Sequence, residues 1–226
     1  GRLKGICISE KRGTEKHEVR EAMVKMDWGI EGDAHGGKWH RQISLLSYDK
    51  IEAFRARGAE VEDGAFGENV IVQGIDFRNL PVGTRLKCND VLLEMTQIGK
   101  ECHHGCEIFQ KMGECIMPTN GVFAKVLHGG KISVGDEFHV QYRAAVITLS
   151  DTASKGERED ASGVAVEEIV GKEGYEVVFK KIIPDDGDTL TALLCELSDE
   201  DKADLILTTG GTGFSKRDNT PEATMR

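Results

Sequence analysis

The second half of the chain alternates two patterns that few folds can combine. The apolar runs "AAVITLS", "YEVVFKKIIP" and "ADLILTT" each have the length and β-branched character of a buried strand. Between them, apolar residues recur at helical spacing over residues 160–171 and 188–197, and Asp188 is expected to cap the second helix. This strand–helix–strand–helix–strand order predicts a parallel sheet with helices on its faces.

The first half has a different rhythm, in which short apolar segments are bounded by glycines. Strands are expected at residues 3–9, 42–47, 69–72, 84–88, 91–97, 121–127 and 136–142, with one helix at 48–57. Many short strands at regular spacing favour a barrel or a sandwich. We therefore predict two domains: a mostly-β barrel over residues 1–142 and an α/β parallel-sheet domain over 143–226. The second segment is shorter than the roughly 100–150 residues usual for such domains, so we expect it to be truncated at its C-terminus.

Charge and composition exclude some classes of protein. The net charge of −10 is uneven, because residues 1–142 carry −2 and residues 143–226 carry −8. Neither half has the basic stripe that nucleic-acid binding requires, and no window is apolar enough to span a membrane. The six cysteines occur without an export signal, which predicts reduced thiols in a cytoplasmic protein.

A glycine-rich turn, "TTGGTG", follows the third apolar run of the second half. Ligands of open α/β sheets bind beyond the carboxyl ends of the strands. Gly210, Gly211 and Gly213 allow the backbone to approach a ligand closely, and Thr220 is expected to cap a helix that begins at Pro221 and faces an anion. The turn matches neither G-x-G-x-x-G nor a Walker loop. Two interpretations remain: a phosphate cradle, or a tight connection from strand to helix.

Acidic residues follow each of the three predicted strands of this domain. Asp151 follows the first strand, Asp185 and Asp186 follow the second, and Asp218 follows the third. Parallel strands would bring these loops to one edge of the sheet, where carboxylates and phosphate oxygens together suit Mg²⁺. The alternative is ordinary turn and cap chemistry, with Asp185 and Asp186 simply following Pro184.

Three blocks of this half, "SDTASKGERED", "IIPDDGD" and "LTTGGTGFSKRDNTPEAT", resemble the molybdopterin adenylyltransferase family. The resemblance covers residues 144–226 and implies the fold of the molybdenum-insertion domains. It implies binding of molybdopterin and Mg-ATP, with transfer of AMP to the terminal phosphate of the pterin. It assigns Asp185 and Asp218 to Mg²⁺ binding and catalysis. The residues that the resemblance and the turn chemistry place around the pterin and nucleotide are Ser150, Asp151, Thr209, Gly210, Gly211, Thr212, Gly213 and Thr220.

In the first half, "GKECHHGCEIFQKMGEC" concentrates cysteine and histidine. Cys102 and Cys106, with the neighbouring histidines, are candidate zinc ligands. Alternatively Cys102 is a reactive thiolate, because the cationic neighbours on both sides of it would lower its pKa. A third interpretation is that these thiols are simply buried in the wall of the barrel.

Other blocks of the first half, "GDAHGGKWHRQISLLS", "GAFGENVIVQGIDFRNLPVGTRLKC", "IGKECHHGC" and "GVFAKVLHGGKISVGDEF", are similar to the MOSC family, a β-rich barrel-like fold. Cys102 stands where that family carries a cysteine proposed to handle sulfur or the metal–sulfur cofactor. The resemblance implies that Asp33, His35 and Asn69 line the pocket of an anionic pterin. The alternative is that "GDAHGG" and "GAFGEN" are glycine turns between strands.

Both resemblances point to molybdenum cofactor biosynthesis. The second domain would adenylylate molybdopterin, and the first would bind, carry or sulfurate the molybdenum cofactor through Cys102. The implied partners are molybdopterin, ATP, a sulfur donor, a molybdoenzyme acceptor and further copies of the chain in a homo-oligomer. The alternatives are a non-catalytic cofactor carrier and a barrel that binds zinc through Cys and His.

Overall fold

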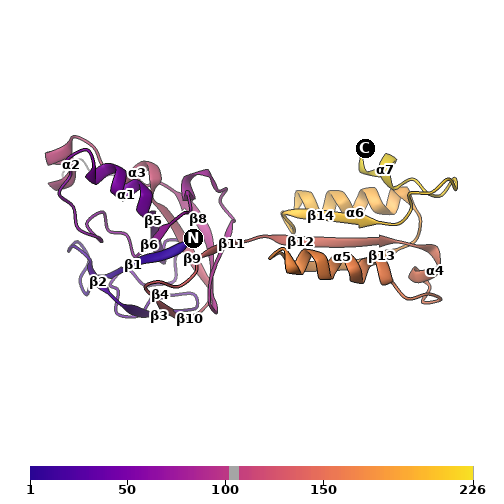
Figure 1. Cartoon of the computed structure of the whole chain (residues 1–226), viewed down its shortest axis with the longest axis horizontal. Helices are drawn as coiled ribbons and strands as arrows, with labels where there is room; N and C mark the ends of the chain where they lie inside the picture. Colours follow the sequence, from indigo (N-terminus) through magenta and orange to yellow (C-terminus); the bar gives the residue numbers. More distant parts are fainter. Residues whose placement is uncertain (102–106, 226) are drawn as a thin grey trace. The chain divides into compact units, whose positions relative to one another are not determined.

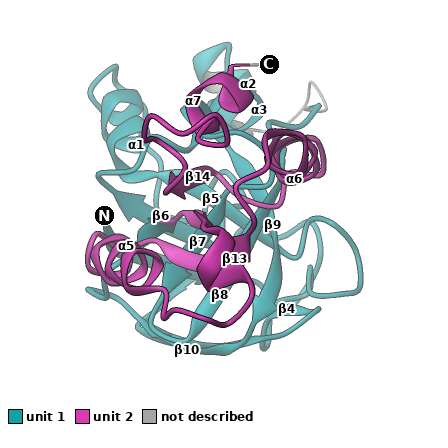
Figure 2. Cartoon of the chain, turned by 90° about the vertical axis from the view of Figure 1, so that its right-hand side faces the viewer, with its two compact units in different colours: residues 1–140 teal, residues 141–226 magenta. Residues whose placement is uncertain are grey.

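The computed structural model describes residues 1–101 and 107–225, and it divides into two compact units. Unit 1 contains residues 1–140 and unit 2 contains residues 141–226 (Figure 2). Over the described ranges, no helix has the length and apolar character needed to cross a bilayer. Each unit has a hydrophobic core of its own.

Unit 1 is built on an eight-stranded mixed sheet in the order β11-β7-β8-β9-β5-β6-β1-β2. Its strands are β1 (Arg2–Ile8), β2 (His17–Val19), β5 (Ile43–Ser47), β6 (Val70–Gln73), β7 (Arg85–Cys88), β8 (Val91–Ile98), β9 (Val122–His128) and β11 (His139–Gln141). β5 and β6 run parallel, whereas β8 pairs antiparallel with both β7 and β9. The sheet curls so that the chain just before β11 meets β1, where Leu3 N donates to Asp136 O (2.9 Å) and Phe138 N to Gly1 O (3.0 Å).

A second, three-stranded sheet of unit 1 has no counterpart among the predicted strands. It has the order β10-β3-β4 and contains β3 (Glu21–Lys25), β4 (Gly29–Ile30) and β10 (Gly130–Ser133). In β3 only Val24 is buried, so the segment lacks the apolar signal that identifies a strand from sequence. The curled mixed sheet is the β-rich domain that was expected, whereas this small sheet was missed.

Short helices share a second core with residues of the curled sheet. They are α1 (Tyr48–Arg55), α2 (Glu107–Met112) and α3 (Met117–Asn120), whereas the 3₁₀ helix η1 (Phe77–Asn79) buries Phe77 in the main core. α1 buries Ile51 and Phe54 against Ile71 and Phe66, which forms a second core outside the main one. Apolar burial of this kind contributes about 25 cal/mol per Å², so α1 holds β5 and β6 in place.

Unit 2 is a three-stranded parallel sheet in the order β13-β12-β14. Its elements are β12 (Arg143–Leu149), α4 (Asp151–Ser154), α5 (Ala161–Lys172), β13 (Glu176–Ile183), α6 (Gly187–Asp199), β14 (Leu205–Thr209) and α7 (Thr220–Thr224). Figure 1 shows α5 and α6 on opposite faces of the sheet. The central strand β12 is continuously apolar because both of its faces are covered. The predicted strand and helix order is present.

Two predicted helix caps were wrong. Asp186 caps α6, since its extended backbone lets its carboxylate accept from Thr189 N at 2.9 Å, and Asp188 already lies within the first helical turn. Asn219 occupies the cap position of α7, because the hydroxyl of Thr220 is used elsewhere and donates to Gly210 O at 3.0 Å. α6 therefore begins two residues earlier than expected, and α7 begins one residue earlier.

Candidate functional site

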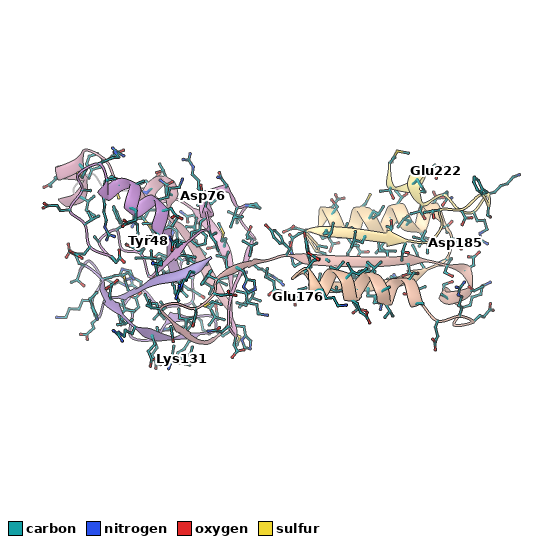
Figure 3. The ribbon with its side chains drawn as sticks, in the orientation of Figure 1. Tyr48, Asp76, Lys131, Glu176, Asp185 and Glu222 are labelled. Atoms are coloured by element: carbon teal, nitrogen blue, oxygen red, sulfur yellow. The ribbon has the colours of Figure 1, made fainter. Side chains whose placement is uncertain are left out.

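Two of the acids predicted at the carboxyl edge of unit 2, Asp151 and Asp185, are joined there by hydrogen bonds from the backbone N–H of each to the carboxylate of the other. Asp151 N donates to Asp185 Oδ2 at 3.0 Å, and Asp185 N donates to Asp151 Oδ1 at 3.2 Å. Figure 3 shows Asp185 at the end of unit 2 where β13 finishes, whereas Glu176 lies at the opposite end of the sheet. These reciprocal bonds fasten the loops after β12 and β13 to each other.

Arg217, from the loop after β14, joins the same pair. Its Nη2 donates to Asp151 Oδ1 at 3.0 Å, and its Nε and Nη2 both lie 3.3 Å from Asp185 O. Arg217 was not among the residues predicted for this site. The guanidinium places a positive charge where three strand-end loops converge. The parallel topology has therefore brought together acids that are far apart in the chain.

The glycine turn lies against these loops. Gly210 and Gly211 have φ of +91° and +60°, conformations that glycine adopts without strain. Thr220 closes the turn, because its hydroxyl donates to Gly210 O and its backbone N donates to Gly211 O at 3.1 Å. A Cβ on Gly211 would overlap Thr220 Oγ1 and lie 3.4 Å from Asp185 Oδ1. The turn is thus tightly packed underneath by Thr220 and Asp185.

The carboxylate of Asp185 has one unsatisfied oxygen. Its Oδ1 is buried and has no hydrogen-bond partner among the residues that the structure describes. Asp218 lies on the other side of the turn, where its Oδ2 accepts from Ser215 N at 3.1 Å and would sit 2.9 Å from a Cβ on Gly213. Both predicted metal ligands therefore border the glycine turn.

The donor set at this edge suits a weakly held Mg²⁺. Across residues 1–101 and 107–225, the structure contains no group of three or more His, Cys, Asp or Glu side chains arranged to hold a metal. Mg²⁺ is commonly bound by one or two carboxylates while waters and substrate phosphates supply the rest. An unsatisfied Asp185 oxygen beside a glycine turn fits that mode, and it does not fit an all-protein metal site.

The other residues predicted for this site have mixed positions. Ser150 caps α4, since its Oγ accepts from Ala153 N at 3.2 Å. Thr209 ends β14 and is half-buried, whereas Thr212 and Gly213 are exposed at the tip of the turn. The structure therefore brings the acids and the glycines to one edge of the sheet. The hydroxyl of Ser150, by contrast, accepts a hydrogen bond from its own helix, α4.

A second candidate site is a pocket of about 770 Å³ in unit 1. Cationic, aromatic, glycine and small polar residues line it. They include Lys16, His35, Trp39, Arg41, Ser44, Gly64, Phe66, Gly67, Asn69, Lys100, Ile108 and Phe123. They come from the loops before β2, after β4, before β6 and after β8, and from β5, β9 and α2. Ligand pockets are typically lined by apolar and aromatic side chains with a few precisely placed polar or charged groups.

Lys16 and Asp33 form a buried ion pair at the pocket. Lys16 Nζ lies 2.9 and 3.0 Å from the two carboxylate oxygens of Asp33, and the two side chains are 2% and 1% exposed. Burial lowers the pKa of Lys16, although Asp33 opposes this. Burial alone would raise the pKa of Asp33, but hydrogen bonds from Ser9 N and Lys16 lower it overall. The two contacts from Lys16 Nζ therefore fix the positions of both side chains.

Asn69 and Glu68 support the floor of the pocket. Asn69 Oδ1 accepts from Ser44 N (3.1 Å) and Ser44 Oγ (2.9 Å), and Asn69 Nδ2 donates to Cys7 O (3.0 Å). Glu68 is fully buried and accepts from Gly64 N at 2.8 Å. Burial raises the pKa of Glu68 to about 7. Asn69, predicted as a ligand contact, thus also ties β5 to the glycine loop.

Arg41 is held in place on the pocket wall. Its Nε donates to Gln97 Oε1 at 2.9 Å, and its guanidinium carbon lies 5.1 Å from the centre of the Phe123 ring. This arrangement leaves a fixed positive charge beside an aromatic face. Lys100 and Ile108, which precede and follow the segment 102–106 in the chain, both line the pocket as well. The predicted residues Cys102 and Cys106 lie outside the described residues, so their roles stay predictions.

Sequence reasoning missed Lys16, Ser44 and Phe123. Lys16 lies in a polar, aperiodic stretch with no motif, so no local signal marks it. Ser44 and Phe123 lie in strands that were predicted, but their facing into a pocket follows from the curl of the sheet. Only the pairing of β5 with β9 shows that Ser44 and Phe123 lie side by side at the pocket.

Comparisons with known proteins agree with both halves. Residues 31–139 match the family model of the MOSC domain, and residues 145–226 match that of a probable molybdopterin binding domain. The chain is 45% identical over 82 residues to the molybdopterin adenylyltransferase of Pyrococcus furiosus, which covers 36% of this chain and 47% of that protein. It is 40% identical over 86 residues to the molybdopterin adenylyltransferase of Escherichia coli K12, covering 37% and 44%.

The chain therefore spans about half the length of the curated relatives it matches. The crystal structure of the YuaD protein from Bacillus subtilis superposes with a TM-score of 0.53 at 20% identity, covering 62% of this chain and 94% of that one. That likeness shows the fold alone. The two family matches follow each other along the sequence, so this chain joins a MOSC domain to a probable molybdopterin binding domain.

Proposed function

We propose that the chain acts in molybdenum cofactor biosynthesis, and that unit 2 binds molybdopterin and Mg-ATP for adenylyl transfer. The observation that carries this proposal is the buried, unsatisfied Asp185 Oδ1 next to the glycine turn, at the strand edge where α/β sheets bind ligands. Its support outside the structure is the identity of 40–45% to proteins named molybdopterin adenylyltransferases.

In this proposal each described group has a distinct task. The backbone N–H groups of the turn from Thr209 to Gly213 would contact phosphate oxygens, and Thr220 keeps the turn in shape. Asp185 and Asp218 would hold Mg²⁺, which when bound offsets the negative charge that develops during phosphoryl and nucleotidyl transfer. Asp151 orients Asp185 through their reciprocal hydrogen bonds.

We further propose that unit 1 binds the anionic pterin of the molybdenum cofactor in its 770 Å³ pocket, and that it carries or sulfurates it. Arg41 and Lys100 supply cations, while Trp39 and Phe123 supply flat apolar walls. Cys102 is the proposed sulfur-handling residue, in line with the MOSC match. In the same proposal, unit 1 receives sulfur from a donor protein and passes the cofactor to a molybdoenzyme, and the chain forms a homo-oligomer.

The transferase proposal is tested with the purified chain, molybdopterin and Mg-ATP, followed by chromatography of the adenylylated pterin. We expect product from the wild type and from Asp199→Asn, a control at the far end of α6, and a loss of about 100-fold in Asp185→Asn. If the wild type binds pterin but forms no product, the chain is a carrier. Stoichiometric zinc without pterin in the isolated protein would instead favour the zinc-binding barrel.

A further inference from the structure

His35 has an unsatisfied ring nitrogen at the unit 1 pocket. Its Nδ1 is buried and makes no hydrogen bond within the described part of the chain, and it lies 3.7 Å from Asp33 Oδ2. The side chain of His35 as a whole is 35% exposed and lines the pocket. The backbone is fixed on both sides, because His35 N donates to Asp33 Oδ2 (3.3 Å) and Trp39 Nε1 donates to His35 O (3.1 Å).

Asp33 holds one weak donor that the ring of His35 can replace. Its carboxylate receives Lys16 Nζ on both oxygens, Ser9 N on Oδ1 and His35 N on Oδ2. These contacts occupy the roughly four acceptor positions of an ionised carboxylate, but the one from His35 N is long at 3.3 Å, so an Nδ1–H of the same residue can take its place. A shift of about 0.5 Å would bring His35 Nδ1 within hydrogen-bond distance of Oδ2. A proton on Nδ1 therefore has a prepared partner.

We propose that His35 senses the charge of the pocket's ligand, so that a bound dianion of the phosphate or sulfate type draws a proton onto His35, whose Nδ1–H then pairs with Asp33. This inference rests on the proposed role of unit 1 as an anion-binding pocket. It adds a charge that depends on the ligand to the permanent charges of Arg41 and Lys100. His35 is then a specificity residue that favours ligands with an ionised phosphate over neutral ones.

The electrostatic surroundings agree with this geometry. Burial, followed by the positive charge of Lys16, lowers the pKa of His35, and Arg12 acts in the same direction. Asp33 is the group that raises it. The unliganded pocket thus keeps His35 neutral near pH 7. An anion within about 4–6 Å would offset Lys16 and Arg12 and shift the balance toward the imidazolium.

Protonation of His35 makes the affinity of the pocket for anions depend on pH. The ligand-bound form takes up a proton that the free form lacks, so anion affinity rises as the pH falls through the window between the free and bound pKa values of His35. The free value lies below 6.5, so this window extends upward from the mildly acidic range. Uptake of one proton gives a slope of at most tenfold in Kd per pH unit.

The experiment uses the intact chain and sulfate, because sulfate itself does not titrate in this range. The ring signals of His35 are followed by NMR against pH, without sulfate and with saturating sulfate. They are assigned with His35→Gln, and His128→Gln serves as the matched control because His128 bonds Asp90 O away from the pocket. We expect the His35 pKa to rise by about one unit, and sulfate Kd to be about three- to tenfold tighter at pH 6 than at pH 7.5.

The possible outcomes test the role of His35 separately from the anion-binding pocket of unit 1. In His35→Gln the pH dependence should weaken to the part that Glu68, with a pKa of about 7, contributes, while sulfate still binds. His128→Gln should behave like the wild type. If sulfate binds and the His35 titration does not move, the inference about His35 is wrong and the anionic pocket stands. If sulfate does not bind the wild type at all, both the inference and the proposed role of the pocket fail. The NMR titration of the wild type decides the matter even if a variant does not fold.

Discussion

Gly210→Ala should selectively destabilise unit 2. Gly210 has φ of +91°, and a Cβ built there would overlap the carbonyl oxygen of Leu149 and lie 3.1 Å from its carbonyl carbon. A positive φ costs alanine about 1–2 kcal/mol. Leu149 ends the central strand β12, so the obstructing atoms are backbone and cannot rotate away, and the overlap adds about 1–3 kcal/mol. The total expected loss is about 2–5 kcal/mol.

The matched control makes the same substitution where the backbone permits it. Gly171 lies in α5 with open space around its Cα, and its φ is not positive. Alanine has the higher helix propensity, so Gly171→Ala should stabilise unit 2 by about 0.5–1 kcal/mol. The two variants share their chemistry and differ only in backbone conformation and contacts, so opposite signs are expected.

The assay is urea unfolding followed by two signals. Both tryptophans of the chain, Trp28 and Trp39, belong to unit 1, so fluorescence reports that unit, whereas the longest helices, α5 and α6, give unit 2 most of the circular dichroism at 222 nm. With a slope of about 1–2 kcal/mol per molar urea, Gly210→Ala should lower the dichroism midpoint by about 1 M or more and leave the fluorescence midpoint unchanged. Equal dichroism midpoints for Gly210→Ala and the wild type would refute the packing argument.

Two further predictions concern unit 1. The folded-state pKa of Glu68 is about 7 against 4.5 for an exposed glutamate, so the stabilisation that comes from this shift is fully present below pH 4.5 and is lost as the pH rises through 7. Urea unfolding by fluorescence should therefore show about 3 kcal/mol less stability at pH 8 than at pH 5, and Glu68→Gln should remove most of that difference; an unchanged pH profile in the variant would show that another group titrates. Lys16→Met leaves Asp33 buried without its cation and should cost about 3–5 kcal/mol in thermal unfolding, part of which the double variant with Asp33→Asn regains. A single variant as stable as the wild type would show that the pair is solvated.

Much of unit 2 follows from local sequence patterns. Its strands and helices carry strong period and length signals, and the parallel order follows from their alternation. The convergence of Asp151, Asp185 and the glycine turn at one edge is a direct consequence of parallel topology. The helix caps were less predictable, because Asp186 and Asp188 offer the same carboxylate and only the exact entry of the chain into α6 selects between them.

In unit 1 only the apolar strands could be predicted from the sequence, because each of them carries its own periodic pattern of apolar residues. The small sheet of β3, β4 and β10 has too few buried residues to be recognised from one segment at a time. The meeting of Lys16 with Asp33, and the unsatisfied position of His35 beside them, depend on how distant loops fold over the curled sheet. Sequence patterns encode which face of an element is buried, whereas a buried ion pair requires long-range packing to exclude water from both partners, and only the tertiary structure decides that.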